Sequence, residues 1–447
     1  MRALGVQGFP MVAIEHPLGG ERPDGVSRRA RQAVEQIRAL LGKASSTGES
    51  ASVPTTGQIG RAEPASATAT GQIGRAEPAS IYFRPPSVEA GLTDLVTIDT
   101  PEAVLAAFCE RQWCDGLPIV PPTEERVRSM LNGAPGDRVL GLMPPLWRQA
   151  TLEKLAVNAV MAGCEPAAFP LIVAAVEAML DPSFNLYGVQ ATTHSVAPLL
   201  IVHGPIAAEL GVHAGSGCFG PGFRANATIG RAIRLILLNV GGAWPGRHDM
   251  ATQGSPAKFS YCIAERPDAS PWGVLHEESV VTVFGGEPPH NVNDHVSTTA
   301  AGILATVADT AVSLGSNVGW YFSQSQLLIV LGPEHAQTIA SDGLSRADVQ
   351  RFVFENARLP LRTLKLGGMW GIQDWPRWMH AVTDDDALMP QVPSPDDVMV
   401  IVAGGPGKHS AVSRTAPSVG SCRVRSGPSS GGAPRSSRGR RAASRVR

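Results

Sequence analysis

Four short runs of residues, apolar apart from Thr282, constrain the fold of this chain most strongly. They lie at 199–202, 280–284, 327–331 and 398–402, and turn or helix signals separate them. Strands of this kind are typical of sheets that are covered on both faces, because neither face carries polar side chains. We therefore expect an α/β or α+β fold, built as a single large, loop-rich domain.

Capping signals and apolar periodicity predict helices between these strands. Thr100 before Pro101 is typical of a helix start and predicts a helix at 102–111. The same reasoning predicts further helices at 123–131, 151–163, 168–180, 206–210, 227–238, 300–314 and 346–357. Residues 241–300 fit this pattern poorly. We expect a loop-dense insertion there, and long loops in compact domains are usually functional.

The first 86 residues do not belong to this main domain. Residues 1–42 predict one βα unit, with a strand at 10–14 and a helix that begins at Ser27. One such unit cannot bury its apolar face alone, so we interpret it as the truncated C-terminal piece of another domain. Residues 43–86 predict a flexible linker.

Within this linker, the undecapeptide TGQIGRAEPAS occurs at 56–66 and again at 70–80. Two copies of a polar Gly/Pro/Ser-rich unit are too few to build a repeat domain. A tandem duplication in a flexible spacer is the simpler interpretation. The main domain then spans 87–410.

The residues after 410 differ sharply in charge from the rest of the chain. Residues 411–447 carry nine Arg, no Lys and no acid, so the rest of the chain has a net charge of −10 although the whole chain has −1. We expect a disordered basic tail, and a frameshifted end is the alternative. The acidic main domain argues against nucleic acid as a partner, since phosphate binding needs a basic surface.

The cysteines and the apolar segments indicate a compartment. Six cysteines scattered through 447 residues are not the pattern of a small disulfide scaffold. The sequence shows no signal peptide and no uninterrupted apolar stretch long enough for a bilayer. We expect a cytoplasmic protein without a membrane partner, and a homo-oligomer is compatible with this. We expect no metal site, although His290 and His295 with Asp294 between them come nearest to the spacing of metal ligands, and no particular cofactor is indicated.

A glycine loop at 215–222 precedes the predicted helix 227–238 and suits an anion. Asn226 is the expected N-cap, and free backbone N–H groups with nearby Arg side chains favour negative charge. The loop also matches G-x-G-x-x-G, but without the strand and the acid of a dinucleotide site, and a close-packed turn is the plain alternative. The expected substrate-binding residues are Gly220, Gly222, Arg224, Asn226, Arg231, Arg247, Lys258 and His409.

The catalytic candidates come from three places. His248 beside Asp249, in the polar loop that begins at 241, would be an oriented base. Cys218 lies in the glycine loop, where a thiolate would be stabilised, and no Cys-x-x-Cys pair is present. Asp115 ranks above Cys114 because the carboxylate would raise the pKa of the thiol. The full set is Cys164, Cys218, His248, Asp249, Asp115 and Glu265. Solvated loop groups, a turn cap at 115 and a satisfied core histidine at 203 are the alternatives.

Two stretches near the start, 5–12 and 16–20, together with the helix that follows them, resemble the C-terminal end of UGSC-type (seleno)proteins. The selenocysteine/cysteine-Gly-Ser-Cys motif that names that family is absent. Gly215-Ser216-Gly217-Cys218 has a different order, so no redox role transfers to any residue. The segments 114–118, 158–164, 220–231 and 241–258 resemble a group of uncharacterised bacterial proteins associated with that domain.

The resemblance implies redox or carbon–heteroatom bond chemistry, by association of domains only. The leading hypothesis is thus an enzyme, an oxidoreductase or a lyase, with thiol-assisted chemistry on a small anionic molecule. The second is a non-redox hydrolase or lyase that uses His248 and Asp249. The third is a non-catalytic binding or scaffold subunit, for which His248, Asp249, Arg224 and Asp115 would not meet in one pocket.

Overall fold

The computed structural model describes residues 27–28, 30–36, 38, 100–313, 326–366, 381–415 and 419–423, with backbone only for 415 and 419–423. The chain divides into two units, Met1–Thr97 and Ile98–Arg447, which are considered separately. In the first unit the described residues within 27–38 are helical, as predicted. The predicted strand at 10–14, the duplicated linker and the residues at 5–20 that carry the family resemblance lie outside the described residues.

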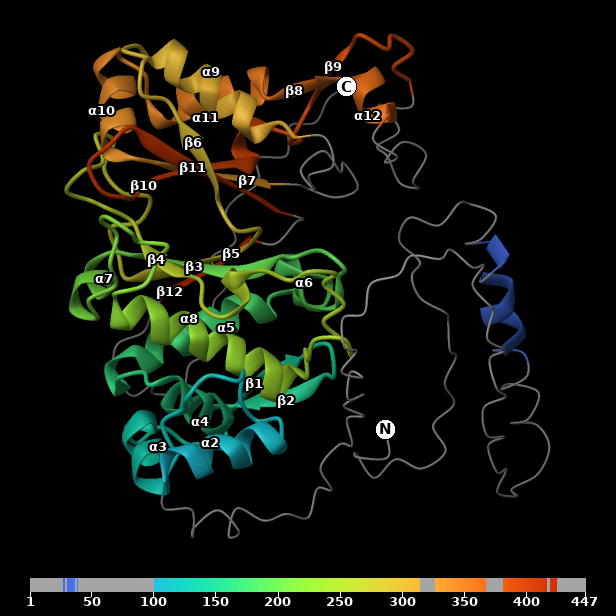
Figure 1. Ribbon diagram of the computed structural model, residues 1–447, viewed down its shortest axis with the longest axis vertical. Helices are drawn as coiled ribbons and strands as arrows, with labels where there is room; N and C mark the ends of the chain where they lie inside the picture. The colour runs from blue at the N-terminus through green and yellow to red at the C-terminus, as the bar shows by residue number, and fades with distance from the viewer. Residues whose placement is uncertain are drawn as a thin grey trace, which may run out of the picture. The chain divides into compact units, whose positions relative to one another are not determined.

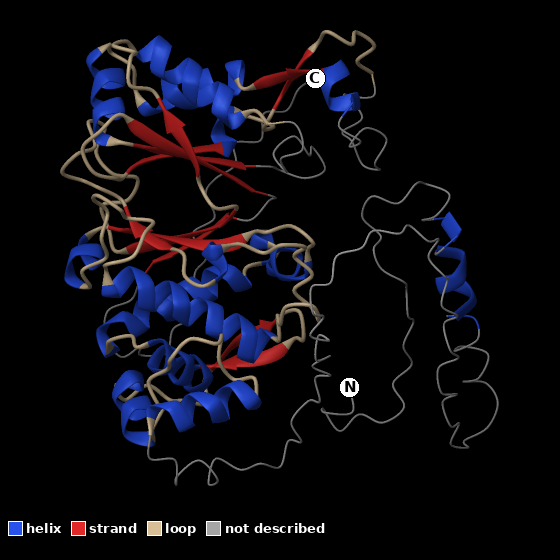
Figure 2. Ribbon diagram, viewed as in Figure 1, coloured by secondary structure: helices blue, strands red, loops and turns tan. Residues whose placement is uncertain are grey.

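Two four-stranded mixed sheets form the centre of the second unit, which is an α+β domain (Figures 1 and 2). One sheet has the order β10-β7-β11-β6 and the other β12-β5-β3-β4. Their strands are β3 Ala197–His203, β4 Cys262–Ala264, β5 Val280–Gly286, β6 His290–Asn293, β7 Gln326–Leu331, β10 Val398–Val402, β11 His409–Thr415 and β12 Val419–Arg423. The pairs β10–β7 and β3–β4 are parallel, and the other pairs are antiparallel.

The apolar runs are explained by burial of both faces of each sheet. In β7, Leu327, Ile329 and Leu331 join a core cluster with the outer helices. The alternate residues Leu328 and Val330 join a second cluster that contains residues of β3, β4 and β5. Because successive side chains of a strand point to opposite faces, both sets of side chains of a strand between a helix layer and a second sheet enter an apolar core.

Helices cover the outer faces of both sheets (Figure 1). α9, α10 and α11 lie over the sheet that contains β7, while α5 and α8 lie over the sheet that contains β3, with α4, α3 and α2 beyond them. The helices are α2 Pro101–Glu110, α3 Glu124–Leu131, α4 Leu152–Ala162, α5 Phe169–Leu180, α6 Leu186–Ala191, α7 Pro205–Glu209, α8 Arg224–Ile236, α9 Ala300–Ala311, α10 Pro333–Ser341, α11 Arg346–Asn356 and α12 Leu361–Leu366.

Smaller elements complete the domain. Two antiparallel pairs lie outside the central sheets: β1 Val139–Met143 with β2 Arg148–Thr151, and β8 Arg358–Pro360 with β9 Leu388–Pro390. Short 3₁₀ turns occur at Pro166–Ala168, Pro182–Phe184, Pro256–Lys258 and Pro395–Asp397, and a π-helical turn, Leu237–Gly241, ends α8. The predicted helices at 102–111, 123–131, 151–163, 168–180 and 346–357 are confirmed to within one or two residues.

The predicted end of the domain at 410 is wrong. β11 runs to Thr415 and pairs with both β6 and β7, and β12 pairs with β5. Ser413 and Arg414 are buried, and their polar groups bond to backbone carbonyls: the hydroxyl of Ser413 donates to Glu287 at 2.7 Å and Nε of Arg414 to Ala311 at 3.2 Å. The basic segment therefore begins with two strands of the central sheets.

The prediction of a loop-dense insertion at 241–300 is also only partly correct. The segment contributes β4, β5 and β6, and β5 lies inside its sheet between β12 and β3. Two long stretches stay irregular, 265–279 and 242–261, and in the latter an isolated bridge joins Pro245 to Asp249 and the 3₁₀ turn Pro256–Lys258 follows. This irregular part lies against α8 and supplies the polar groups described next.

Candidate functional site

The start of α8 differs from the prediction at Asn226. The helix begins at Arg224, and Phe223 occupies the cap position without a side-chain hydrogen bond. Asn226 is therefore inside the first turn, where it is buried. Its Nδ2 donates to the carbonyls of His213 at 2.9 Å and Cys262 at 3.1 Å, and its Oδ1 accepts from the N–H of His213. Through these hydrogen bonds Asn226 connects the segment that leads into the glycine loop to β4. The prediction of Asn226 as an N-cap and anion ligand is therefore wrong.

Three arginines on α8 each meet a carboxylate from a distant segment. Arg224 is exposed and pairs with Glu165 at 2.7 Å. Arg231 binds Asp115 through two parallel hydrogen bonds of 2.8 Å and also donates to two carbonyls of the 115–118 turn. Arg234 pairs with Asp249 at 3.0 Å.

Arg231 thus has a buried anionic partner, which contradicts its predicted role in an anion clamp, whereas Arg224 meets Glu165 at the surface and its role stays a prediction. Asp115 has a structural role for the same reason, since its carboxylate is 5 % exposed and also accepts from the N–H of Leu117. The third arginine, Arg234, was not predicted. In the sequence, Arg234 stands among the apolar residues of α8. From that position a buried cation with an anionic partner could have been predicted.

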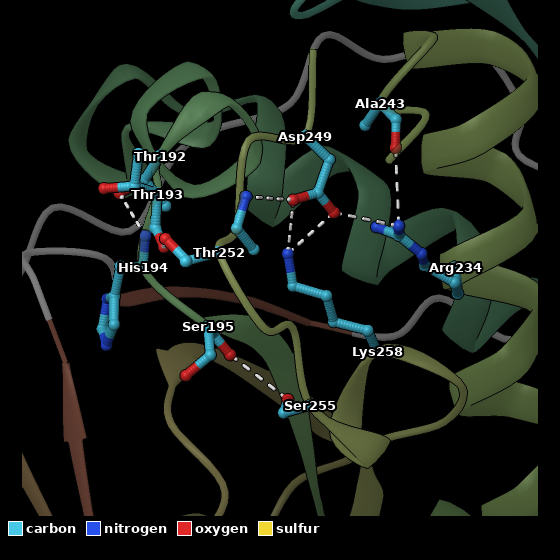
Figure 3. A network of polar contacts seen from close by, with 11 residues as sticks. Thr192, Thr193, His194, Ser195, Arg234, Ala243, Asp249, Thr252, Ser255 and Lys258 are labelled. Carbon is cyan, nitrogen blue, oxygen red and sulfur yellow. Dashed lines mark hydrogen bonds and ion pairs between the residues drawn. The ribbon is translucent and has the colours of Figure 1, made fainter. Parts of the chain in front are cut away.

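Asp249, Arg234 and Lys258 form a buried network of one carboxylate and two cations (Figure 3). Lys258 Nζ lies 2.7 Å from both carboxylate oxygens of Asp249. The side chains of Asp249, Arg234 and Lys258 are 3 %, 11 % and 12 % exposed. Burial lowers the pKa of Lys258 and of Arg234, against the opposing effect of Asp249. With both cations protonated, the network carries one uncompensated positive charge.

Hydrogen bonds hold this irregular loop against the segment that enters β3 (Figure 3). The N–H of Thr252 donates to the carbonyl of Thr193 at 3.0 Å, and the hydroxyl of Ser255 donates to that of Ser195 at 3.2 Å. The N–H of Ala251 also donates to Asp249. These bonds fix the position of Asp249 and Lys258 relative to α8, as a site for a small ligand requires.

A small pocket adjoins the network. Its polar lining comes from Gln190 on α6, Arg234, Lys258 and Tyr261, and Val196 and Ile233 are among its apolar residues. It has room for about one water molecule. Oε1 of Gln190 is buried and meets no hydrogen-bond partner among the described residues. Gln190 and Tyr261 were not predicted, because nothing in the local sequence pattern distinguishes them from polar residues of a core.

His248 does not act on Asp249 in this structure. Its Nδ1 donates to the carbonyl of Gly242 at 3.1 Å, whereas among the described residues the carboxylate of Asp249 meets only cations and a backbone N–H. Neighbouring residues in this turn point apart, so the expected His248–Asp249 dyad is wrong. Arg247 is exposed. Of the predicted residues of this loop, only Asp249 and Lys258 reach the pocket region.

The thiols of Cys164 and Cys218 are buried and lack the environment that stabilises a thiolate. Burial raises the pKa of Cys164 to about 12, and the thiol donates to the carbonyl of Thr228 at 3.2 Å. Burial also raises the pKa of Cys218 to about 11, and its side chain packs in the core between the two sheets. The expected lowering of the Cys218 pKa by the glycine loop is wrong.

The other predicted residues lie elsewhere. Gly220 and Gly222 remain in an irregular loop next to α8, and Gly222 has φ of 115°, a conformation that favours glycine. Glu265 is buried, 1 % exposed, and binds His203 at 3.0 Å, Arg346 at 3.3 Å and the N–H of Leu275. Its carboxylate neutralises the charge of Arg346 inside the domain and is not accessible to a ligand. His203 is the satisfied core histidine that was the alternative from the sequence.

His409 begins β11, an inner strand between β7 and β6. Its Nε2 lies 3.0 Å from Nε2 of His295, and its Nδ1 lies 3.0 Å from Oδ1 of Asn291. The structure therefore does not bring His409 together with the loop at 241–258. Among the described residues, no three His, Cys, Asp or Glu side chains form a group that could hold a metal ion.

No family model, curated protein or solved structure matches this chain. Across the described ranges, no single helix is long and apolar enough to cross a membrane, and one bent helix pair, Pro166–Leu180 with Pro182–Ala191, passes by length and composition only.

Proposed function

We propose that this protein is an enzyme that binds a small anionic molecule at the pocket beside Asp249, Arg234 and Lys258. The observation that supports it is the pair of buried cations sharing one carboxylate, next to the amide oxygen of Gln190, which has no partner among the described residues. A ligand carboxylate or phosphate would balance the remaining positive charge. The amide of Gln190 could accept a hydrogen bond from a ligand hydroxyl or, turned over, donate to an anion.

Lys258 is the residue that we propose for proton transfer. An ammonium whose pKa is lowered by burial gives up its proton more readily than an exposed lysine, as general-base lysines must. The reaction would then be of hydrolase or lyase type. Since the pocket admits about one water molecule, only the charged end of a substrate would enter it without movement of the 242–261 loop.

Thermal-shift measurements with formate, acetate, glycolate and inorganic phosphate test the binding part. A bound anion at 100 times its dissociation constant is expected to stabilise the full chain by about 2.7 kcal/mol. Lys258→Met removes one charge-assisted hydrogen bond and is expected to weaken binding by about 10- to 100-fold. This variant should fold, because Asp249 keeps Arg234 as its partner.

Arg224→Gln is the matched control, since Arg224 is an exposed arginine on the same helix. The proposed binding at the pocket would be refuted if the anion stabilised wild type and Lys258→Met equally. It would also be refuted if only Arg224→Gln lost the stabilisation by the anion. The thiol hypothesis is tested in parallel: a Cys164→Ser/Cys218→Ser variant that retains turnover would leave Cys164 and Cys218 with structural roles.

A binding or scaffold role is the second candidate. It is favoured by the separate partners of the residues that were expected to converge: Asp115 binds Arg231, Arg224 binds Glu165, and His248 binds Gly242. A binding protein would lose affinity on Lys258→Met but would turn over no ligand in wild type. A cytoplasmic location and the relationship to UGSC-type proteins remain parts of the proposal.

A further inference from the structure

The two sulfur atoms of Cys109 and Cys114 lie 3.3 Å apart, and both thiols are free. Cys109, in the last turn of α2, is exposed, whereas Cys114 is 4 % exposed. The sequence gives no hint of this pair, because four residues separate the cysteines and no familiar dithiol motif has that spacing. The pair is independent of the pocket at Lys258.

The end of α2 explains why the thiols meet. Gln112 adopts a left-handed conformation with φ of 56°. Its N–H donates to the carbonyl of Cys109, and the N–H of Trp113 donates to that of Phe108. These two bonds form a Schellman motif, which reverses the chain after the helix. Trp113 packs edge-on against Phe108 at 5.6 Å, which holds the reversal and returns Cys114 over Cys109.

The other described cysteines are placed differently. The thiol of Cys164 donates to a backbone carbonyl, and Cys218 and Cys262 are buried. Of the thiols that the structure describes, Cys109 alone is exposed, and it has a second sulfur beside it. An exposed thiol next to a buried one is the arrangement in which the first attacks a disulfide and the second resolves it.

We propose that Cys109 and Cys114 form a redox-active dithiol that exchanges with a small-molecule disulfide. The Cys109 thiolate attacks one sulfur of the disulfide RSSR, forms a mixed disulfide and releases one thiolate, which is protonated. Cys114 loses its proton to solvent and attacks the Cys109 sulfur, which releases the second thiolate. In total two protein thiols are oxidised to one disulfide, and RSSR is reduced to two RSH.

The geometry allows this step with little movement. The sulfur atoms must approach by about 1.3 Å to reach a disulfide bond length of roughly 2.05 Å. Burial raises the pKa of Cys114 to about 11, so Cys114 stays protonated at neutral pH and leaves the first attack to Cys109. Exchange is therefore expected to become faster as the pH rises, since both steps need a thiolate.

Incubation of the full chain with oxidised glutathione tests the proposal, followed by alkylation, tryptic digestion and mass spectrometry. Trypsin cleaves after Arg111, between the two cysteines, so a Cys109–Cys114 disulfide appears as two linked peptides. In wild type, the linked peptides are expected to exceed the glutathione adduct at Cys109 by at least about tenfold, because the second thiol is already in place.

Three variants complete the test. Cys114→Ser should accumulate the glutathione adduct at Cys109, and Cys109→Ser should leave Cys114 reduced. Cys164→Ser, which keeps a donor for the Thr228 carbonyl, should form the linked peptides as wild type does. The proposal is overturned if wild type accumulates as much adduct as Cys114→Ser, or if the linked peptides form only in urea.

Discussion

Replacement of Asp249 by alanine is expected to destabilise the second unit by about 3–5 kcal/mol. The change leaves Arg234 and Lys258, which are 11 % and 12 % exposed, without their shared carboxylate. Two like charges then remain buried side by side, and the N–H of Ala251 loses its acceptor as well. Urea unfolding of the full chain, followed by circular dichroism, measures the loss.

Glu165→Gln is the matched control, because it removes a carboxylate from another α8 arginine at an exposed position. Exposed ion pairs contribute about 0–1 kcal/mol to the free energy of unfolding, so the stability of this variant should be close to that of wild type. If Asp249→Ala proved as stable as Glu165→Gln, the description of a buried charge network at α8 would be incorrect.

Arg231→Met is expected to lower the free energy of unfolding by a similar amount, about 3–5 kcal/mol. It leaves the carboxylate of Asp115 buried without its bidentate partner, and the carbonyls of Leu117 and Pro118 without donors. An Asp115→Ala/Arg231→Met double variant removes both charges, and should therefore be more stable than the sum of the two single losses predicts. Additive losses across this double-mutant cycle would contradict a direct Asp115–Arg231 interaction.

Much of the fold follows from local sequence patterns. Caps such as Thr100 and Ser345 mark helix starts correctly, and the apolar runs at 199–202 and 327–331 are buried strands. The strand β11 could not be found in this way. It carries Ser413 and Arg414, whose burial is compensated by carbonyls of Glu287 and Ala311, more than 100 residues away. In the sequence alone, a polar strand of this kind cannot be distinguished from a disordered terminal segment.

The candidate site was only partly predictable for the same reason. Asp249 and Lys258 were recognised as polar residues of an irregular loop. Their partner Arg234 and the amide of Gln190 come from helices on either side of β3 in the chain, so only the fold brings them together. The dithiol was missed because it depends on the left-handed conformation of Gln112, which non-glycine residues seldom adopt.

A crystal structure of the wild-type protein soaked with glycolate tests the central claim most directly. We expect the glycolate carboxylate within about 4 Å of both Arg234 and Lys258, with the amide of Gln190 hydrogen-bonded to the ligand. Glycolate bound instead at the glycine loop 215–222, or a pocket that holds only water at saturating glycolate, would contradict it.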